Sequence, residues 1–490
     1  MTDMSASLET AAHPERLRRV VIEPLSRVEG HGKVTLLLDD AGHVKEARLH
    51  IVEFRGFEKF IQGRPYWEVP VMVQRLCGIC PVSHHLAASK ALDVIVGARH
   101  LTPAAEKLRR LMHYGQILQS HALHFYHLCT PDLLFGFDSD AARRNIVEIA
   151  AQHPETARKG VLIRKFGQEV IRHTAGKRIH GTGSVPGGVN KSLTAAERNE
   201  LLAHIYDIVH WSREAVALVK ELHAQQPALY NSFGAVRAKT MSLIGAGGQM
   251  DLYDGRLRAR DENGALIFDG IDYAGYGSLI EEQVKPWSYM KFPYLKSFGA
   301  EDGWYRVGPL SRVQNCDVIP TPLAEIERRE FVDYSGGAPS QAPLGYHWAR
   351  MIEMLHAAET IKDLLHDEDV LGDALVTSGE RAQEGVGVIE APRGTLIHHY
   401  RVDENDLVTM CNLIVSTTHN NQAMNESVRE VARRYLNGRD VTEGLLNHLE
   451  VAIRAFDPCL SCATHALGRM PLIVELLDPD GELVSSLQRD

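Results

Sequence analysis

The chain has 490 residues, of which 44% are hydrophobic and 24% are charged. These fractions are typical of globular proteins and exclude a disordered chain, a collagen-like chain and a small disulfide-stabilised domain. The 53 Lys and Arg against 63 Asp and Glu give a net charge of −10, so we expect no nucleic-acid partner, because such binding needs a basic surface. We recognise neither a secretory signal nor an apolar run of membrane-spanning length, and expect a cytoplasmic protein without a membrane span.

In chain order, the sequence begins with a polar stretch over residues 1–18, which we expect to be a loose tail. Short apolar runs over 20–51, broken by turn residues, predict a small antiparallel sheet. From Pro81 the pattern becomes helical, and Thr102-Pro103 predicts the start of a long helix over 104–128. The first quarter of the chain therefore predicts one sheet followed by helices.

The rest of the chain is predicted to be mainly helical, with one interruption. Thr194 and Glu197 have the spacing of a capping box before a helix over 201–222. The stretch 250–305 is β-rich and contains Asp-Gly and Asn-Gly turns. Further helices are predicted over 343–371, 425–436 and 443–456. We expect an α+β fold that is mainly α: a long central helix bundle, a small N-terminal antiparallel sheet and a β-rich insertion, in a single domain over 19–465.

Seven cysteines are too few for a disulfide framework in a chain of this length. Four of them form two Cys-x-x-Cys pairs near opposite ends of the chain, Cys77 with Cys80 and Cys459 with Cys462. This spacing lets two thiolates bind one metal. If the pairs act together, the fold must bring both ends of the chain to one point. Four thiolates suit zinc, an iron–sulfur cluster, or nickel with iron. The other three are expected to be buried as small hydrophobic residues: Cys129, Cys316 and Cys411.

The residues around the two pairs narrow this choice. Residues 75–84 read R-L-C-G-I-C-P-V-S-H, and residues 457–465 read D-P-C-L-S-C-A-T-H. The two segments resemble the paired signatures of the [NiFe]-hydrogenase large subunit, R-x-C-G-x-C-x-x-x-H and D-P-C-x-x-C-x-x-H. The related quinone-site subunit of respiratory NADH dehydrogenase shares the fold but lacks the four cysteines. The sequences around the cysteines resemble most the soluble, NAD-reducing bidirectional branch of the family.

The resemblance implies a binuclear metal centre. Cys77 and Cys459 would be terminal ligands of nickel, and Cys80 and Cys462 would bridge nickel to an iron that carries CO and cyanide. The implied reaction is the reversible, heterolytic oxidation of dihydrogen to protons and electrons. Heterolysis needs a Lewis acid and a base, and by resemblance the sulfur of Cys459 takes the proton.

Two glutamates receive roles from the resemblance. Residues 27–31, R-V-E-G-H, resemble the family element whose glutamate, here Glu29, relays the proton beyond the thiolate. Without that context Glu29 reads as a surface residue in a turn. Residues 54–58, F-R-G-F-E, resemble the segment that supplies a magnesium ligand, which we assign to Glu58 rather than Glu53 from its spacing to the first cysteine pair. His465 would be the second protein ligand of magnesium.

Four further residues are expected around the metals. Residues 391–394, A-P-R-G, resemble the loop whose arginine, here Arg393, lies over the open site; alone it reads as a structural arginine on a turn. Asp457 would pair with it. The hydroxyl of Ser416, or alternatively Thr417, would donate to an iron-bound cyanide, and His84 would donate to a bridging sulfur or a diatomic ligand. The chain departs from many relatives at Ser120, where they carry an aspartate.

Residues 466–490 follow His465 and read as a hairpin. In the family, a nickel-dependent endopeptidase removes such a tail after metal insertion, which places the cleaved bond between His465 and Ala466. The alternative is a permanent edge hairpin. We find no motif for an iron–sulfur cluster or a flavin. The electrons therefore need partners, which we expect to be a small iron–sulfur hydrogenase subunit and diaphorase subunits that lead to NAD. The resemblance also implies maturation proteins, namely the endopeptidase and metal-insertion proteins.

Two other functions remain open from the sequence. A hydrogen sensor would keep the same ligands but turn over slowly, and sensing members typically lack the removable tail. A non-catalytic metal-binding scaffold related to respiratory NADH dehydrogenase would need neither Glu29 nor Arg393.

Overall fold

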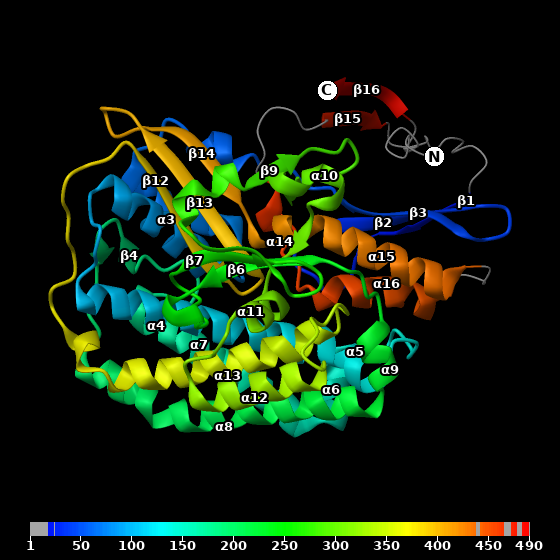
Figure 1. Ribbon diagram of the computed structural model, residues 1–490, viewed down its shortest axis with the longest axis horizontal. Coiled ribbons are helices and arrows are strands. Elements are labelled where there is room, and N and C mark those ends of the chain that lie inside the picture. The colour runs from blue at the N-terminus through cyan, green and yellow to red at the C-terminus, as the bar shows by residue number, and fades with distance from the viewer. Residues whose placement is uncertain (1–17, 24, 438–441, 465–471, 478–482, 490) are drawn as a thin grey trace.

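The computed structural model describes residues 18–23, 25–437, 442–464, 472–477 and 483–489. Helices dominate and the strands form small sheets (Figure 1), which confirms the predicted mainly α, α+β fold. The helices are α1 Phe57–Ile61, α2 Val69–Met72, α3 Pro81–Ile95, α4 Pro103–Leu123, α5 Thr130–Phe135, α6 Ile146–Gln152, α7 Pro154–Ala175, α8 Ala195–Gln225, α9 Pro227–Ser232, α10 Gly299–Asp302, α11 Pro309–Asn315, α12 Pro322–Tyr334, α13 Gly345–His366, α14 Ser416–His419, α15 Asn421–Leu436 and α16 Glu443–Ala455. The strands are β1 Arg18–Ile22, β2 Gly32–Leu38, β3 Val44–Ile51, β4 Ser184–Val185, β5 Gly188–Val189, β6 Lys239–Ile244, β7 Arg256–Arg260, β8 Leu266–Ile271, β9 Ile280–Gln283, β10 Phe292–Leu295, β11 Tyr305–Arg306, β12 Glu384–Ala391, β13 Gly394–Val402, β14 Val408–Ile414, β15 Leu472–Leu477 and β16 Leu483–Arg489.

A bundle of long helices forms one side of the molecule. Helices α4, α7, α8 and α13 run along its long axis, with α12 beside α13 (Figure 1). Helices α4 and α7 approach closely because glycines face each other: a Cβ atom on Gly167 would lie 2.7 Å from the carbonyl oxygen of Gly115. The bundle thus packs backbone against backbone at this point, which a larger residue would prevent.

The predicted helices are present, but several of their starts and lengths differ. Thr194 and Glu197 form the capping box, but α8 begins directly after it and is longer than predicted. The hydroxyls of Thr102 and Thr442 cap α4 and α16. The helix predicted over 104–128 changes at its end into a π-helical turn, His124–Cys129. Apolar spacing does not reveal such a turn, because one inserted residue hardly alters the pattern.

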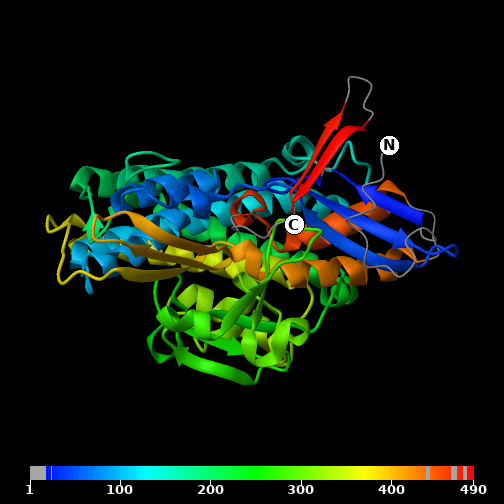
Figure 2. The same cartoon turned by 90° about the horizontal axis from the view of Figure 1, so that it is seen from above.

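Strands form several small sheets around the bundle. The N-terminal sheet β1-β2-β3 is antiparallel, as predicted. The β-rich insertion contains the sheet β11-β6-β7-β8 and the pair β9-β10, and its strands project to one side of the body (Figure 2). Its first strand, β6, lies before the predicted start at residue 250. A long connection separates β6 from its partner β7, so the sequence around β6 does not reveal the pairing. The strands β15 and β16 pair antiparallel in the predicted C-terminal hairpin.

A third antiparallel sheet, β12-β13-β14, was not predicted. Helix α3 packs on it, and a Cβ atom on Gly387 of β12 would lie 2.2 Å from the Ala87 carbonyl oxygen. The sheet and α3 together bring residues 391–394 close to the first cysteine pair, since the turn between β12 and β13 lies at one end of the sheet.

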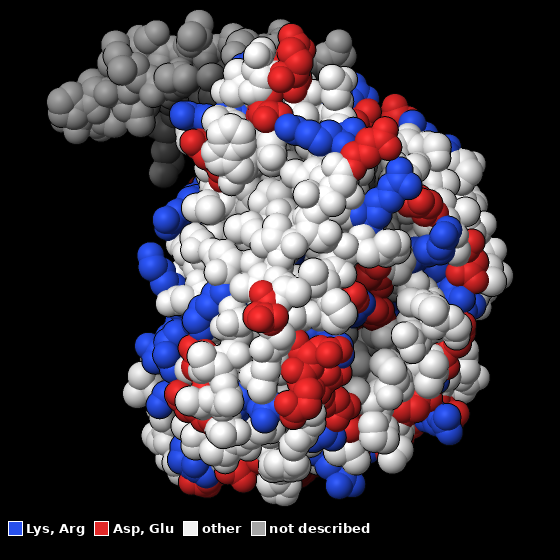
Figure 3. Space-filling model, turned by 90° about the vertical axis from the view of Figure 1, so that its left-hand side faces the viewer, with Lys and Arg blue, Asp and Glu red and all other residues white. Residues whose placement is uncertain are grey.

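None of the helices in the described part of the chain combines the length and the apolar character that a bilayer span requires. On the face drawn in Figure 3, acidic and basic side chains are interspersed, and no continuous basic surface is visible. This agrees with the negative net charge of the sequence. The predicted N-terminal tail lies almost entirely outside the described residues.

Candidate metal centre

The fold brings the two cysteine motifs together. Cys77 follows a 3-10 turn, and Cys80 directly precedes α3, whose first residue is Pro81. At the other end of the chain, α16 ends just before Asp457, and Cys459 forms an isolated parallel β-bridge with Glu29. The N-terminal segment thereby holds the second motif against the first.

The four cysteine sulfurs form one cluster, with all four atoms within 4.8 Å of one another. The distance between Cys77 Sγ and Cys459 Sγ is 3.3 Å, and that between Cys80 Sγ and Cys462 Sγ is 3.7 Å. All four side chains are buried, and none forms a disulfide. The sequence alone could not establish this meeting of the two pairs, and the structure shows it.

Burial and contact among the sulfurs shift the pKa values of these thiols in opposite directions. Burial raises the pKa of Cys459 and Cys462 well above the ordinary value, because a thiolate is costly in a dry site. Burial also opposes ionisation of Cys77, but hydrogen bonds from the other three thiols and the charge of Arg393 lower its pKa. Four such donors fit nickel with iron, which favour soft thiolate ligands.

A small cavity lies beside the cysteines. Cys80, Cys459 and Cys462 form part of its lining, and the rest comes from α3, the turn between β12 and β13, and the start of α14. Its wall combines apolar side chains such as Leu396 and Val415 with a few polar ones. The cavity measures about 10 Å³, which leaves room for one water-sized group beside the sulfurs.

The Glu29 carboxylate lies against the second motif. Cys459 Sγ donates to Glu29 Oε2 at 2.9 Å, and the backbone nitrogen of Ser461 donates to the same oxygen at 3.2 Å. The close approach requires glycine at position 30, which has φ +82°, because a Cβ atom there would lie 2.6 Å from the Ser461 nitrogen. The carboxylate is therefore fixed within proton-transfer distance of one thiol.

Arg393 and Asp457 form a buried ion pair at the edge of the cavity. Arg393 Nη2 lies 3.0 Å from Asp457 Oδ1, and Arg393 Nε donates to the Asp457 carbonyl oxygen at 2.5 Å. Burial alone would lower the pKa of Arg393, but the charges of Asp457 and the nearby thiols raise it well above its usual value. Arg393 Nη1 is buried and has no hydrogen-bond partner among the described residues. A fixed cation with one unused donor therefore lines the cavity.

Comparison with known proteins decides the family. A family model described as nickel-dependent hydrogenase matches residues 55–153 and 261–465, and a model described as HoxL-like matches residues 19–54. The chain belongs to the nickel-dependent hydrogenase family. It is thus a large subunit of a [NiFe]-hydrogenase, as the two cysteine motifs predicted.

The relatives agree with this assignment. The beta subunit of the NAD-reducing hydrogenase HoxS from Cupriavidus necator is 48% identical and aligns over 96% of this chain and 100% of its own length. The alpha subunit of sulfhydrogenase 2 from Pyrococcus furiosus is 31% identical, with coverage of 91% and 98%. A crystal structure of an NAD+-reducing [NiFe]-hydrogenase in the H2-reduced state is 60% identical, with a TM-score of 0.90 and coverage of 91% and 99%. The [NiFeSe]-hydrogenase of Desulfovibrio vulgaris Hildenborough, 23% identical with coverage of 92% and 100% and a TM-score of 0.74, shares the fold.

Three more predicted residues of this hydrogenase line the cavity. Ser416 Oγ donates to the Gly394 carbonyl oxygen at 2.7 Å, whereas Thr417 Oγ1 accepts from the Cys459 nitrogen at 2.9 Å. His84 Nδ1 lies 3.1 Å from His398 Nε2. Burial lowers the pKa of His84 to about 4, so its imidazole is neutral at pH 7.

The predicted magnesium ligands are only partly described. Glu58 is buried on α1, and its Oε1 accepts from the Leu413 nitrogen at 2.9 Å. The nearby Arg55 nitrogen donates to the Thr464 carbonyl oxygen at 3.1 Å, so the Glu58 segment lies beside the end of the second motif. His465 and the bond to Ala466 lie outside the described residues. Glu53 is partly exposed, and its Oε2 lies 3.4 Å from Ser461 Oγ.

Sequence reasoning missed the charged network that holds the Arg393 loop. Arg312 of α11 donates to Glu353 at 2.5 and 2.7 Å, to Glu390 at 2.8 Å, and to the carbonyl oxygen of Ala391 at 2.8 Å. His121 lies 3.0 Å from Glu353 as well. All four charged or titratable side chains are buried. The only available signal is the presence of charged residues in otherwise apolar helices, which does not identify their partners.

Ser120 and the three cysteines outside the two motifs all lie in the interior of the protein. The Ser120 hydroxyl is buried without a hydrogen-bond partner among the described residues. Cys129, Cys316 and Cys411 are buried, as predicted. Cys129 forms a compact group with His124 and His347, but His124 Nε2 is 2.6 Å from the Arg454 carbonyl oxygen. That hydrogen bond occupies the His124 nitrogen that lies nearer to Cys129 Sγ, at 3.1 Å.

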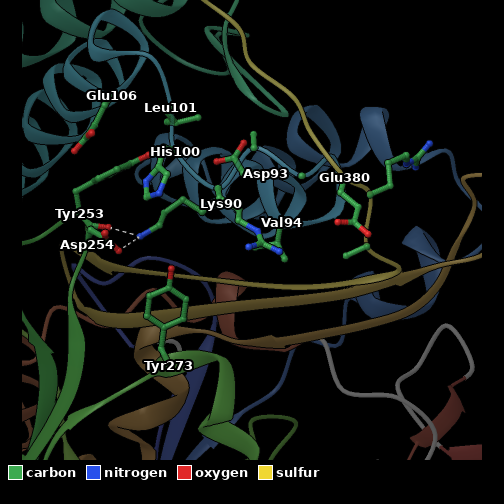
Figure 4. A pocket seen from close by; sticks show the side chains of 15 residues that line it. Lys90, Asp93, Val94, His100, Leu101, Glu106, Tyr253, Asp254, Tyr273 and Glu380 are labelled. Carbon is green, nitrogen blue, oxygen red and sulfur yellow. Dashed lines mark hydrogen bonds and ion pairs between the residues drawn. The ribbon is translucent and has the colours of Figure 1, made fainter.

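A larger, open cavity of about 430 Å³ lies at the far end of α3 (Figure 4). Lys90 reaches into it, but its ammonium already donates to Asp254 at 2.9 Å and to two backbone carbonyl oxygens. Asp93 binds Arg109. Because these buried charges are satisfied within the protein, they indicate a structural link between α3, β12 and the insertion rather than a ligand site.

Proposed function

We propose that this chain catalyses the reversible, heterolytic oxidation of dihydrogen at a nickel–iron centre and that the electrons pass through an iron–sulfur partner to NAD. The observation that supports this best is the contact between Cys459 Sγ and Glu29 Oε2 at 2.9 Å, beside a cavity lined by Arg393. A metal-storing or structural tetrathiolate site has no use for a carboxylate and a cation in these positions. The name of the 48% identical relative supports NAD as the acceptor.

The thiolates of Cys77, Cys80, Cys459 and Cys462 would hold nickel and an iron that carries CO and cyanide. When bound, the metals would supply the Lewis acid and the electron acceptor that cleavage of dihydrogen requires. The Cys459 sulfur then holds one proton and passes it to Glu29, which is already in hydrogen-bond contact. Arg393 keeps a positive charge beside the cavity, because its guanidinium does not lose its proton. Ser416 or Thr417, and His84, orient the small ligands of iron.

Electrons must leave a buried site, so we assign the partner to the surface next to the first motif. His180 Nε2 lies 3.0 Å from the Cys77 carbonyl oxygen, and His180 Nδ1 bonds the exposed Arg75 at 2.8 Å. Exposed Phe54, Phe60 and Trp67 belong to the segment that precedes this motif. Exposed aromatic residues are typical of protein interfaces, and the relatives' names describe subunits of larger hydrogenases.

The remaining parts of the proposal rest on the family resemblance. Glu58 and His465 would bind magnesium, and a maturation endopeptidase would remove residues 466–490 after His465 once metal-insertion proteins have acted. Diaphorase subunits would complete the path to NAD, which suits a cytoplasmic enzyme. Intact-mass measurement of the purified protein tests the cleavage: a chain that ends at His465 supports it, and a chain that ends at Asp490 contradicts it.

The central test is purification of the complex from its own cells, followed by elemental analysis and a hydrogen-dependent NAD reduction assay. Equal nickel and iron together with hydrogen-dependent NADH formation would support the proposal. Zinc without nickel or iron would contradict it and leave a structural role for the chain. Nickel and iron with hydrogen binding but negligible turnover would favour a sensor.

A further inference from the structure

A separate cavity of about 250 Å³ lies between the N-terminal sheet and α15 and shares no lining residue with the cavity beside the cysteines. Three cationic side chains line it: Arg48 of β3, Lys285 of the loop between β9 and β10, and Arg429 of α15. Strand β3 and helix α15 lie side by side at this end of the molecule (Figure 1). The cations therefore come from three elements that the fold brings together.

Trp287 lines the same cavity and contacts two of the cations. The Arg48 guanidinium lies 5.2 Å from the centre of its ring, and Lys285 Nζ lies 5.9 Å from it. Arg48 is 6% exposed, so its charge is largely removed from water. Lys285 Nζ lies closer still to the Phe292 ring, at 4.2 Å, so the two cations rest on neighbouring aromatic side chains.

Lys285 is the cation of this group with the least compensation. Arg429 pairs with Glu426 at 3.1 Å, and Glu46, which also lines the cavity, acts on Arg48. Lys285 Nζ donates to the neutral amide oxygen of Gln422 at 2.9 Å, and within the described residues no carboxylate lies at ion-pair distance from it. An ammonium has three donors, so Lys285 retains unused ones.

The cations of this cavity repel one another, and this repulsion helps to lower the pKa values of Lys285 and Arg48. The pKa of Lys285 is lowered by burial and by the cations of Arg429 and Arg48, although Glu426 attracts it. The pKa of Arg48 is lowered by burial first and also by Arg429, while Glu46 opposes this change. An anion in the cavity would remove the repulsion among the cations.

We propose that this cavity binds a phosphate-type oxyanion, either free phosphate or the phosphate end of a small ester. The Arg429 guanidinium and the Lys285 ammonium supply the planar and point-like donors that phosphate oxygens accept, and the positive charge of Arg48 lies beside them. The volume suits such a small group, since sites for drug-sized ligands start near about 300 Å³. The ring of Trp287 is occupied by the cations, so it does not serve as a stacking surface for a base. This site is independent of the hydrogen chemistry.

The test uses the full chain and two probes, inorganic phosphate and AMP, at constant ionic strength with chloride as the exchanged ion. Tryptophan fluorescence and thermal unfolding report binding, and Trp287→Phe assigns the fluorescence change to the cavity. We expect saturable binding of at least one probe. Lys285→Gln and Arg429→Gln should each weaken it about tenfold or more, because each removes a charge-assisted hydrogen bond. The matched control is Lys45→Gln. Lys45 is an exposed cation of β3, the strand of Arg48, and it pairs with Asp39 at 3.0 Å.

Binding of AMP with equal or higher affinity than phosphate would assign a phosphomonoester as the ligand, and binding of phosphate alone would assign the free ion. The absence of saturable binding, or equal affinity in the wild type and both cavity variants, would overturn the proposal. So would binding of hexaglutamate in place of both probes, since it would indicate an acidic protein segment instead. None of these readouts involves hydrogen turnover, so the result does not depend on the proposed enzymatic function.

Discussion

The Glu29 carboxylate accepts hydrogen bonds from both the Cys459 sulfur and the Ser461 backbone nitrogen, although it lies near the opposite end of the chain. One oxygen atom, Oε2, receives both. The backbone bond fixes the carboxylate, while the contact with sulfur leaves it able to exchange a proton. Glu29 therefore has a structural contact, with the Ser461 nitrogen, and a contact suited to proton transfer, with the Cys459 sulfur. The two can be tested separately.

Glu29→Gln keeps the size of the side chain and an oxygen that can accept from Ser461, but removes the proton acceptor. We expect unchanged nickel and iron content and a fall of about 10²-fold or more in hydrogen–deuterium exchange with solvent. Glu53→Gln is the matched control, because Glu53 is also a carboxylate beside the second motif but approaches it at the Ser461 hydroxyl, at 3.4 Å. Loss of nickel in Glu29→Gln would show a structural residue instead.

Cys459→Ser replaces a soft thiolate by a hard oxygen donor at the position closest to Glu29. We expect hydrogen-dependent reduction of an artificial dye to be abolished, because the hydroxyl is both a poorer nickel ligand and a poorer base at this site. Cys316→Ser changes a buried thiol whose Sγ lies 3.6 Å from the Val313 carbonyl oxygen. That control should retain turnover. Normal rates in Cys459→Ser would contradict the assigned role.

Asp457→Asn removes the carboxylate that pairs with the buried Arg393. We expect the free energy of unfolding of the metal-free chain to fall by about 3 kcal/mol, since a buried cation would lose its counter-ion. Asp406→Asn is the control: it breaks the exposed pair with Arg381 and should cost no more than about 1 kcal/mol. Both aspartates have left-handed backbone conformations, with φ 56° and 68°, so the backbone preference is matched. Urea titration followed by circular dichroism measures both, and equal losses would contradict the prediction.

Acid should destabilise the fold well above the range in which carboxylates titrate. Burial lowers the pKa of several histidines to about 3 or 4: His113, His121, His347, His356 and His419. Their unfolded forms take up protons near pH 6.5. Between pH 6.5 and about 4 the unfolded state therefore binds more protons, and the free energy of unfolding falls as the pH falls, by up to about 1.4 kcal/mol per pH unit for each histidine.

Urea titrations at pH 7.5, 6 and 5 measure this dependence. His356→Gln should flatten it, because one buried imidazole is lost. A stability that does not vary between pH 7.5 and 5 would contradict the expectation.

The sequence predicted the residues of the candidate metal centre but not the contacts that hold them in place. Cys77, Cys80, Cys459 and Cys462 could be identified as candidate metal ligands from their spacing and from the resemblance of the residues around them, but only the structure shows the two pairs together. The Arg312 network could not be predicted, because a buried charge chooses its partners in three dimensions. The sheet β12-β13-β14 was missed for a different reason. Seven of the eight residues of β12 are buried, so the polar–apolar alternation that marks a half-exposed strand is absent.

The parallel bridge between Glu29 and Cys459 also bears on the order of events during synthesis. The segment around Glu29 is translated 430 residues before Cys459, its partner in the bridge. Until then the first cysteine pair has no second pair beside it, and Glu29 has no sulfur to contact. Contacts this distant in sequence form late and slowly. The two cysteine pairs therefore meet only after the second motif has been translated, and a metal that needs all four thiolates can be bound only after that step.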